Sequence, residues 1–139
     1  MAKKSQPKTL KLKGVIKDRN VIVLMYSKNT HNYIYINFVK KLNHLVYPSK
    51  DLLLMIIDGQ KVEGVGRCHR VSVQIQEMDL QTSFYALQLY GMDMVLGGKW
   101  LMQLENYNIL EEQFVILISN KIINYTLLKV PLSRKINCN

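Results

Sequence analysis

Apolar side chains in this sequence recur mostly at every second position or in short continuous runs, which is the spacing of β-strands. In residues 9–16 leucine alternates with lysine, and the polar residues 17–20 then separate this segment from the apolar run 21–25. Apolar and polar side chains alternate again in residues 71–76. The pattern predicts an all-β domain that begins with a β-hairpin turning near Asp18.

Two short helices are predicted to interrupt the strands. Apolar residues recur at helical spacing in residues 36–42, which predicts the first helix. The second is predicted where Trp100 and Leu104 follow Gly97-Gly98. Because large apolar side chains at helical spacing usually pack inward, Trp100 is expected in the core rather than in a binding site.

A second hairpin is predicted around Asp58-Gly59, a dipeptide typical of tight turns. It follows the continuous apolar run 52–57 and precedes residues 61–63. Gly64 and Gly66 lie in its returning arm, where two flexible backbone positions favour a mobile hairpin tip over a packed strand. Further strands are expected at residues 80–89, 94–96, 114–118 and 122–130. Together the strands predict a small, barrel-like all-β domain with one or two short helices.

Length and composition indicate one folded domain with a basic N-terminus. The chain has 139 residues, of which 48% are hydrophobic and 21% charged, and this fits a single globular domain. It carries a net charge of +9, and many of its cationic residues fall near the N-terminus: Lys3, Lys4, Lys8, Lys11, Lys13, Lys17 and Arg19. We interpret them as a solvated tail over residues 1–8 and a strand face, with nucleic-acid binding through this end as the alternative. The domain is then expected over residues 9–130, followed by a tail over residues 131–139.

The sequence has no N-terminal apolar segment typical of a secretory signal and no run of about eighteen apolar residues that could cross a membrane. Its two cysteines, Cys68 and Cys138, lie far apart, which fits a reducing compartment. An intracellular location is predicted, with cytoplasm and nucleus both open. Because the first predicted strand begins so close to residue 1, we also expect the chain to be a piece of a longer polyprotein.

The order of these motifs resembles the retropepsin-like aspartic protease domain of plant gypsy-class LTR retrotransposon polyproteins, over about residues 9–118. The first hairpin leads into YSKNTHNYI, in which Thr30-His31-Asn32 and Ile34 match the family's active-site loop. The resemblance implies a closed barrel, an aspartic endopeptidase ancestry, and a homodimer in which each subunit supplies one aspartate. It implies no metal and no cofactor.

Two further motifs carry the resemblance. The hairpin that contains Asp58, Gly59, Val65 and Gly66 is similar to the flap that folds over a bound peptide in this family. The segment 95–97, followed by Trp100-Leu101, is similar to the apolar-apolar-Gly segment and helix that brace the catalytic loop from behind. The resemblance therefore implies a peptide or polyprotein ligand under the flap.

The sequence differs from the family at the residues that carry out catalysis. Where the family has Asp-Ser-Gly, this chain has Tyr26-Ser27-Lys28. An aspartic protease brings two carboxylates together so that they share one proton, and one of them then activates water. A tyrosine phenol ordinarily has a pKa of about 10, so it is a poor base near neutral pH. None of the ten acidic residues is followed by Ser/Thr-Gly at the end of an apolar strand, and the domain is therefore predicted to be catalytically inactive.

Lys28 is a second obstacle, because a side chain replaces the glycine that lets the family's loop turn closely beside its symmetry mate. Two such lysines about 6 Å apart would repel each other by ~3 kcal/mol at an effective dielectric constant near 20. The homodimer is therefore predicted to be weakened.

Other catalytic arrangements are disfavoured. Adjacent strand residues point to opposite faces, so Cys68 and His69 are not expected to form a nucleophile pair, and pairing Cys68 with His31 would require the flap arm to contact the loop. A nucleophile at Ser27 lacks an acid placed to orient His31. A zinc site is disfavoured because the chain's histidines and cysteines show no paired ligand spacing; the histidines are His31, His44 and His69.

Two functional alternatives stay open beside an inactive protease domain. The first is a peptide- or nucleic-acid-binding module that keeps the flap for strand addition. The second is the non-catalytic half of a heterodimer, which ranks last because an intact partner would supply only one of the two aspartates.

Overall fold

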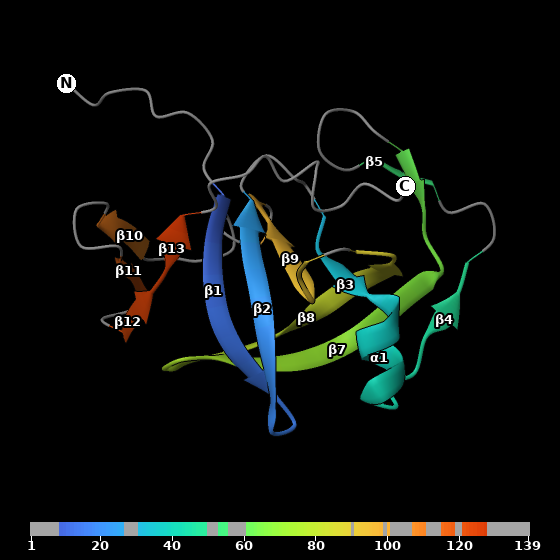
Figure 1. Cartoon of the computed structure of the whole chain (residues 1–139), viewed down its shortest axis with the longest axis horizontal. Coiled ribbons are helices and arrows are strands. Elements are labelled where there is room, and N and C mark those ends of the chain that lie inside the picture. The colour runs from blue at the N-terminus through green and yellow to red at the C-terminus, as the bar shows by residue number, and fades with distance from the viewer. Residues whose placement is uncertain are drawn as a thin grey trace.

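The structure, a computed structural model, describes residues 9–26, 31–49, 53–55, 61–89, 91–98, 100, 107–110, 115–118 and 121–127. Within these ranges the elements are mostly strands (Figure 1). In chain order they are β1 (Thr9–Ile16), β2 (Arg19–Tyr26), β3 (Tyr33–Tyr35), α1 (Ile36–Lys41), β4 (Tyr47–Pro48), β5 (Leu53–Met55), β6 (Lys61–Glu63), β7 (Gly66–Ile75), β8 (Met78–Leu87), β9 (Met94–Gly97), β10 (Tyr107–Leu110), β11 (Val115–Ile118), β12 (Lys121–Asn124) and β13 (Thr126–Leu127).

Six strands close into a barrel in the order β1-β2-β9-β3-β8-β7, and the pairing of Val15 in β1 with Gln74 in β7 completes the ring. The barrel is mixed, because β2–β9 and β3–β8 are parallel while the other neighbours in the ring are antiparallel. β13 extends the sheet beside β1, and β4 extends it beside β7. The predicted all-β class and closed barrel are confirmed.

The first hairpin forms as predicted. β1 pairs with β2 from Thr9↔Tyr26 to Ile16↔Arg19, which leaves Lys17 and Asp18 as a two-residue turn. Both turn residues have positive φ, 47° and 65°, as a type I′ turn requires. The twist of this turn type matches the twist of the strands, so the hairpin closes without splaying.

Alternation along β2 separates two hydrophobic clusters. Val21, Val23 and Met25 belong to the main core inside the barrel. Leu24 points the other way, into a second cluster, which we call the outer cluster. The outer cluster consists of Leu24, Tyr33, Leu87, Leu89, Met92 and Val95. Strands β2, β3, β8 and β9 are therefore covered by apolar side chains on both faces.

The helix predicted over residues 36–42 is confirmed with its end one residue earlier. α1 covers Ile36–Lys41 and buries Phe38 and Val39 against the main core. Asn43, just after the helix, has a φ of 54°, the left-handed conformation that commonly ends helices. Of the second predicted helix, Gly98 and Trp100 are helical, and Trp100 is buried in the main core as expected. The rest of that helix lies outside the described residues.

β7 contains a β-bulge. The pairs Cys68↔Phe84 and Val71↔Thr82 leave two residues of β7 opposite one residue of β8. Cys68 and Val71 are both buried, so the two residues between them, His69 and Arg70, both face solvent. Arg70 takes up the irregularity with a φ of 53°.

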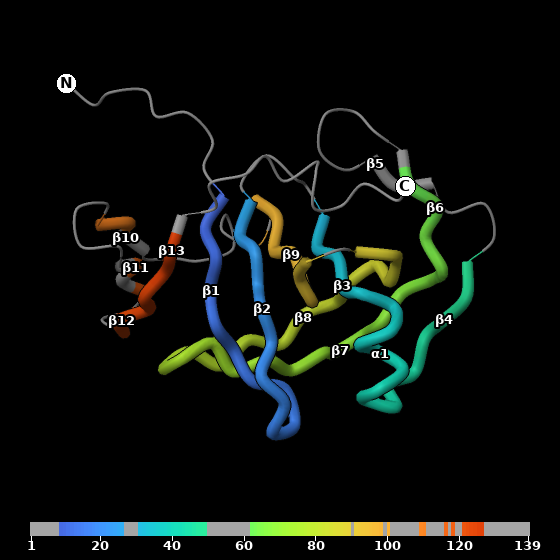
Figure 2. The backbone as a smooth tube through the Cα atoms, in the orientation of Figure 1, coloured from blue at the N-terminus to red at the C-terminus, as the bar shows by residue number. Residues whose placement is uncertain are grey.

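Three short strands were not predicted from the sequence: β3, β4 and β10. Each has only two to four residues, and such segments become strands through partners distant in the chain. β3, for example, pairs with β8 and β9. The strands β10 to β13 lie on one side of the barrel and β4 to β6 on the other (Figure 2).

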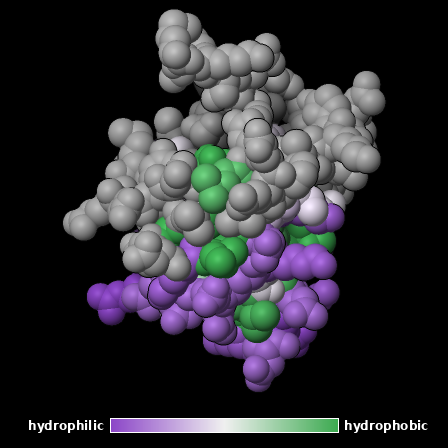
Figure 3. Space-filling view, turned by 90° about the vertical axis from the view of Figure 1, so that its left-hand side faces the viewer, coloured by the Kyte–Doolittle hydropathy of each residue, from purple (hydrophilic) through white to green (hydrophobic). Residues whose placement is uncertain are grey.

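The surface on the side of β10 to β13 is mostly hydrophilic where it is described, with separated apolar spots (Figure 3). Within the described ranges, the structure has no helix with the length and apolar character needed to cross a membrane.

The expectation that Gly66 loosens a mobile hairpin arm is wrong. Gly66 begins β7, is buried, and is the Cα partner of Pro48 in β4 and Ala86 in β8. A Cβ at this position would lie 2.9 Å from the carbonyl carbon of Tyr47 and 3.0 Å from the Cα of Pro48. Glycine is required here because the backbone of β4 approaches closely.

We expect Gly66→Ala to lower the free energy of unfolding by about 2 kcal/mol, because β4 must move away from β7 to accommodate the methyl group. Urea unfolding monitored by circular dichroism measures the change. Gln74→Ala, at an exposed position of the same strand, is the matched control and should change stability by less than about 0.5 kcal/mol. Equal stabilities of the two variants would contradict the close approach.

Candidate active site

The candidate active-site loop joins the end of β2 to the start of β3. β9 runs between these two strands, parallel to β2 and antiparallel to β3 (Figure 1). Gly97 is the partner of Tyr26, and Val95 is the partner of Tyr33. The two ends of the loop are therefore held by one strand, as expected for a segment that braces the loop.

Asn32 fastens this arrangement with three hydrogen bonds. Its Oδ1 accepts a hydrogen bond from the backbone N–H of Gly97 at 2.9 Å. Its carbonyl oxygen accepts one from the backbone N–H of Tyr85 at 2.9 Å, and its Nδ2 donates to the carbonyl oxygen of Ser83 at 3.4 Å. One side chain thus links the loop to both β9 and β8.

Asp93 plays a similar part at the other end of β9. Its carboxylate accepts a hydrogen bond from the backbone N–H of Ile22 at 2.8 Å, and its own N–H donates to the carbonyl oxygen of Ile22 at 3.0 Å. Its carbonyl oxygen accepts from the N–H of Tyr35 at 2.9 Å. Asp93 therefore extends the bridge between β2 and β3 beyond the strand itself. This acid is engaged with the backbone of β2, at the end of β9 opposite Tyr26.

Tyr26 is the last residue of β2, half-buried, and packs against the outer cluster. Val62 of β6 packs against the same cluster, so the arm of the predicted flap and Tyr26, the residue predicted to replace the family's aspartate, contact one apolar surface. The side chain at this position is a phenol and supplies no carboxylate. Three other candidate loop residues, Ser27, Lys28 and Thr30, lie outside the described residues.

The structure describes part of the predicted flap. β5 pairs with β6 in antiparallel register from Leu53↔Glu63 to Met55↔Lys61, which confirms the second hairpin. Its turn, with Asp58 and Gly59, lies outside the described residues. Val65 is 46% exposed and its N–H donates to the carbonyl oxygen of Ala86 at 2.8 Å. Val65 and Gly66 thus belong to the junction between hairpin and barrel.

Tyr33 lies beside the loop but is not a candidate base. Burial raises the pKa of its phenol to about 12, and the neighbouring Tyr85 adds to the shift. Tyr33 is fully buried in the outer cluster, and its Cα partners are Tyr85 in β8 and Val95 in β9. It therefore keeps its proton across the range in which proteases work.

The two candidate cysteine–histidine pairs do not assemble, and Ser27 lies outside the described residues. Cys68 is buried in the main core while His69 is exposed, so the two face opposite sides of β7 as predicted. Burial raises the pKa of the Cys68 thiol to about 11, which leaves little of the reactive thiolate at neutral pH. His31 is exposed and contacts the ring of Tyr85, on the opposite side of the sheet from Cys68. Across the described ranges, no three His, Cys, Asp or Glu side chains gather as a metal site would require.

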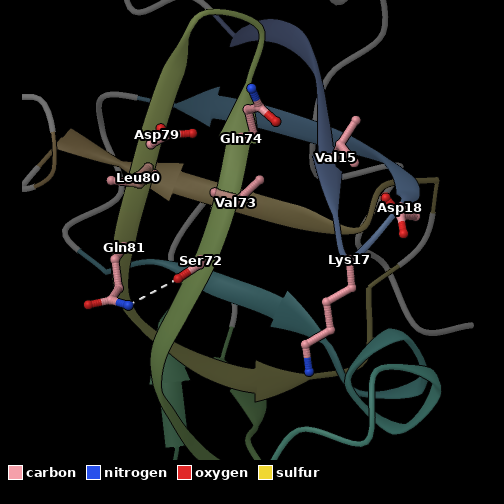
Figure 4. Close-up of a pocket in the computed structure, with 9 residues that line it drawn as sticks. All are labelled: Val15, Lys17, Asp18, Ser72, Val73, Gln74, Asp79, Leu80 and Gln81. Atoms are coloured by element: carbon pink, nitrogen blue, oxygen red, sulfur yellow. Dashed lines mark hydrogen bonds between the residues drawn. The ribbon is translucent and has the colours of Figure 1, made fainter.

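Two surface depressions lie away from the candidate loop. The first, of about 440 Å³, lies between the β1–β2 turn and the β7–β8 hairpin and is lined by the residues labelled in Figure 4. There Gln81 donates to the hydroxyl of Ser72 at 3.0 Å, and the side chain of Lys17 reaches toward the end of α1. The second, of about 560 Å³, is lined by Lys11, Lys13, Gln76, Asn124, Tyr125 and Thr126. Neither contains a residue of the candidate site.

A closed mixed barrel, with one strand inserted between the two ends of a loop and a hairpin attached beside it, defines the retropepsin-like class of proteins. A family model described as retroviral aspartyl protease matches residues 3–122, and the chain belongs to that family.

One solved structure agrees with this assignment at the level of the fold. The chain is similar to the retroviral protease-like domain of Ddi1 from Leishmania major, with a TM-score of 0.65 and 16% identity over 86% of this chain and 94% of that one. It also aligns with a retropepsin-like aspartic protease from Rickettsia conorii, with a TM-score of 0.49 and 12% identity over 86% of each chain. No curated protein matches the chain in sequence at a significant level.

The sequence analysis did not identify the structural roles of Asn32 and Asp93. Asn32 was noted only as part of the loop motif, and its partner Gly97 follows 65 residues later. Their positions next to buried strands could have suggested these roles, because a polar side chain at such a place usually forms hydrogen bonds with backbone groups.

We expect Asn32→Ala to lower the free energy of unfolding by about 1–2 kcal/mol, because the N–H of Gly97 loses its partner in a partly buried place. Asn32→Asp keeps the oxygen that accepts from Gly97 but replaces the donor to Ser83 by a second oxygen facing that carbonyl, so it should cost less than Asn32→Ala. Urea unfolding of the three proteins provides the measurement. If the two variants lose the same free energy of unfolding, the hydrogen bond from Gly97 to the Asn32 side chain does not stabilise this end of the loop.

Proposed function

We propose that the chain is a retropepsin-like domain that has lost aspartic endopeptidase activity. The observation that carries the proposal is the phenol of Tyr26 at the end of β2, where the resemblance to the family calls for the catalytic aspartate. The proposed domain covers residues 9–130. Its motif order supports an origin in a plant gypsy-class LTR retrotransposon polyprotein.

The chemical reason is the absence of a proton-sharing pair. Two carboxylates a few ångströms apart cannot both ionise, and the single proton they hold lets one accept a proton from water while the other donates to the substrate carbonyl. Two tyrosines related by a dimer axis would both stay protonated near neutral pH, since the ordinary pKa of a phenol is about 10. A site built this way has no base to activate water.

Lys28 would contribute to the loss of proteolytic activity because it weakens the homodimer. A retropepsin site is completed by a second subunit, and a lysine in place of glycine beside the axis introduces both bulk and like charge. The proposed consequence is a homodimer weaker than the family's. The barrel does not require a partner to close, because its six strands already form a ring within one chain.

The purified protein should show no pepstatin-sensitive cleavage of a mixed peptide library between pH 3 and 7. The double reversion Tyr26→Asp with Lys28→Gly should restore cleavage, measured by mass spectrometry of the products. Tyr26→Asp alone should restore less, because the dimer stays weak. Lys28→Gly alone should strengthen self-association in analytical ultracentrifugation without activity, and it is the matched control.

Pepstatin-sensitive cleavage by the unmodified chain would overturn the proposal. A folded double variant that dimerises and still cleaves nothing would show that the defect lies elsewhere in the site.

A second candidate function is the binding of an extended peptide beneath the β5–β6 hairpin. The observation in its favour is that Val62 of the hairpin and Tyr26 pack against the same outer cluster, so hairpin and loop share one surface. We propose that Asp58, Gly59, Val65 and Gly66 contribute to this flap. A peptide would add to the exposed strand edges through main-chain hydrogen bonds, a mode that needs no catalytic aspartate.

This second candidate predicts that replacing residues 56–60 by a short Gly-Ser linker abolishes peptide binding, measured by fluorescence anisotropy with a labelled peptide selected from the library. The replacement stops before β6, because Val65 and Gly66 are bonded into the barrel. Gln74→Ala is the control that should bind normally. Unchanged affinity after the replacement would exclude the hairpin as the binding element.

A further inference from the structure

The outer face of β4, β7 and β8 carries aromatic and cationic side chains in alternation. Tyr47 in β4 is the direct partner of Arg67 in β7, and Arg67 is the direct partner of Tyr85 in β8. Partners in an antiparallel pair project from the same face of the sheet. These three side chains therefore form a row across three adjacent strands, in the order aromatic, cation, aromatic.

Ring contacts join further residues to this row. The guanidinium carbon of Arg67 lies 5.1 Å from the centre of the Tyr85 ring, within cation–π range. His31 meets the other side of the row, with its ring centre 5.2 Å from that of Tyr85 in an edge-to-face arrangement. The rings of Tyr47 and His69 lie 4.9 Å apart and are tilted by 58°. We call this surface the aromatic-basic face: His31, Tyr47, Arg67, His69, Arg70 and Tyr85.

The β-bulge in β7 enlarges this face. In a regular strand only one of two successive residues would point outward, but the bulge exposes both His69 and Arg70. His69 is held in place from two sides, since its carbonyl oxygen contacts Nε2 of His44 at 2.9 Å and its Nδ1 contacts the hydroxyl of Ser83 at 3.4 Å. The bulge thus places Arg70 on the surface as a second cation beside Arg67.

The side chains of the face remain accessible. Tyr47 is 52% exposed, and Leu45 beside it in the sequence is 64% exposed. Arg67, His69 and Arg70 are all exposed, while Tyr85 is half-buried. Exposed rings grouped beside cations differ from the isolated apolar residues that most protein surfaces carry.

The charge of the face has one sign. Residues 43–49, 65–71 and 82–87, which form it and its surroundings, contain no aspartate or glutamate. The acid nearest in sequence within the described part of the chain is Glu63, in β6. A cationic surface without acids attracts a polyanion, and the net charge of +9 acts in the same direction.

We propose that the aromatic-basic face binds single-stranded nucleic acid, with a base stacked on the exposed ring of Tyr47, phosphates held by Arg67 and Arg70, and Tyr85 positioning Arg67 through the cation–π contact. Stacking on exposed rings requires unpaired bases, and aromatic side chains interleaved with cations are the general means of binding single strands without sequence preference. Tyr47 and Tyr85 are separated by two strand spacings, about 10 Å, with Arg67 between them. An acidic peptide would use the arginines but leave the ring of Tyr47 without a stacking partner.

This surface is distinct from the basic N-terminus and requires no catalytic function. Its residues are His31, just before β3, and side chains of β4, β7 and β8, whereas the N-terminal nucleic-acid alternative rested on the cationic residues between Lys3 and Arg19. Binding at this face and loss of proteolysis at Tyr26 can therefore be tested separately.

The test is fluorescence anisotropy of the full chain with labelled oligothymidylate, with a duplex of equal length, and with polyglutamate, over a series of salt concentrations. We expect oligothymidylate to bind tighter than the duplex. Tyr47→Leu should weaken binding about tenfold, the equivalent of one lost stacked base. Arg67→Gln should weaken it and lower the slope of log Kd against log salt by about one.

The matched control is Lys121→Gln, which removes one exposed charge from β12 on the side of the molecule opposite β4 (Figure 1). It should change the affinity less than twofold. Equal losses for Arg67→Gln and Lys121→Gln, or tighter binding of the duplex or of polyglutamate, would overturn the proposal. The proposal would also be overturned if changing Lys3, Lys4 and Lys8 to Gln abolished binding while Tyr47→Leu had no effect.

Ultraviolet crosslinking provides a second measurement on the unmodified chain, so the result does not depend on the folding of any variant. Oligothymidylate crosslinks should map by mass spectrometry to the peptide that contains Tyr47. Crosslinks confined to other peptides would contradict the assignment.

Discussion

The insertion of β9 between β2 and β3 is the constraint on which both the barrel and its candidate active site depend. Among the described strands β2 and β3 do not pair with each other, and β9 joins them in the ring order, so the barrel closes only when residues 94–97 are in place. Asp93 bonds to Ile22 at one end of this strand, and Asn32 bonds to Gly97 at the other. Because these contacts join segments far apart in the sequence, their loop-closure entropy must be overcome before they stabilise the fold.

The same arrangement is compatible with the proposed loss of the catalytic acid. The contacts that position the loop are backbone pairings, the amide of Asn32 and the packing of the outer cluster, and none of these uses a carboxylate at residue 26. In the family's homodimer, two aspartates held together oppose the association of the subunits through mutual repulsion and desolvation. The phenol of Tyr26 packs against the outer cluster and carries no such charge, so under the proposed loss of activity the stability of the fold does not depend on a catalytic acid.

Residue patterns predicted the parts of the fold that are locally determined. The alternation in residues 9–16 and the Lys17-Asp18 turn were sufficient to predict the first hairpin, because side-chain alternation and turn conformation are properties of neighbouring residues. β3 was missed since three residues carry too short a pattern, and their strand conformation depends on β8 and β9. The role of Gly66 was misjudged for a related reason, because the backbone that requires a glycine there belongs to β4.

The candidate site was predictable only through the family motif. Tyr26 and its neighbours were assigned to the site because the loop motif is continuous in sequence, and the predicted loss of a carboxylate rests on residue type alone. Asn32 and Asp93 act on backbone groups more than 50 residues away, a relation that no local pattern contains. The gathering of His31, Tyr47, Arg67 and Tyr85 on one face likewise follows from register, which is set by the closure of the whole barrel.

The bulge in β7 affects how the sequence of this barrel can evolve. Side chains on a strand alternate, so the insertion or deletion of a single residue would normally exchange the interior and exterior of everything beyond it. Here the left-handed turn at Arg70 absorbs one extra residue, and Cys68 and Val71 both still face inward. The barrel can therefore gain outward-facing chemistry at this point without any alteration of its interior, which makes the middle of β7 a place where surface and core vary independently.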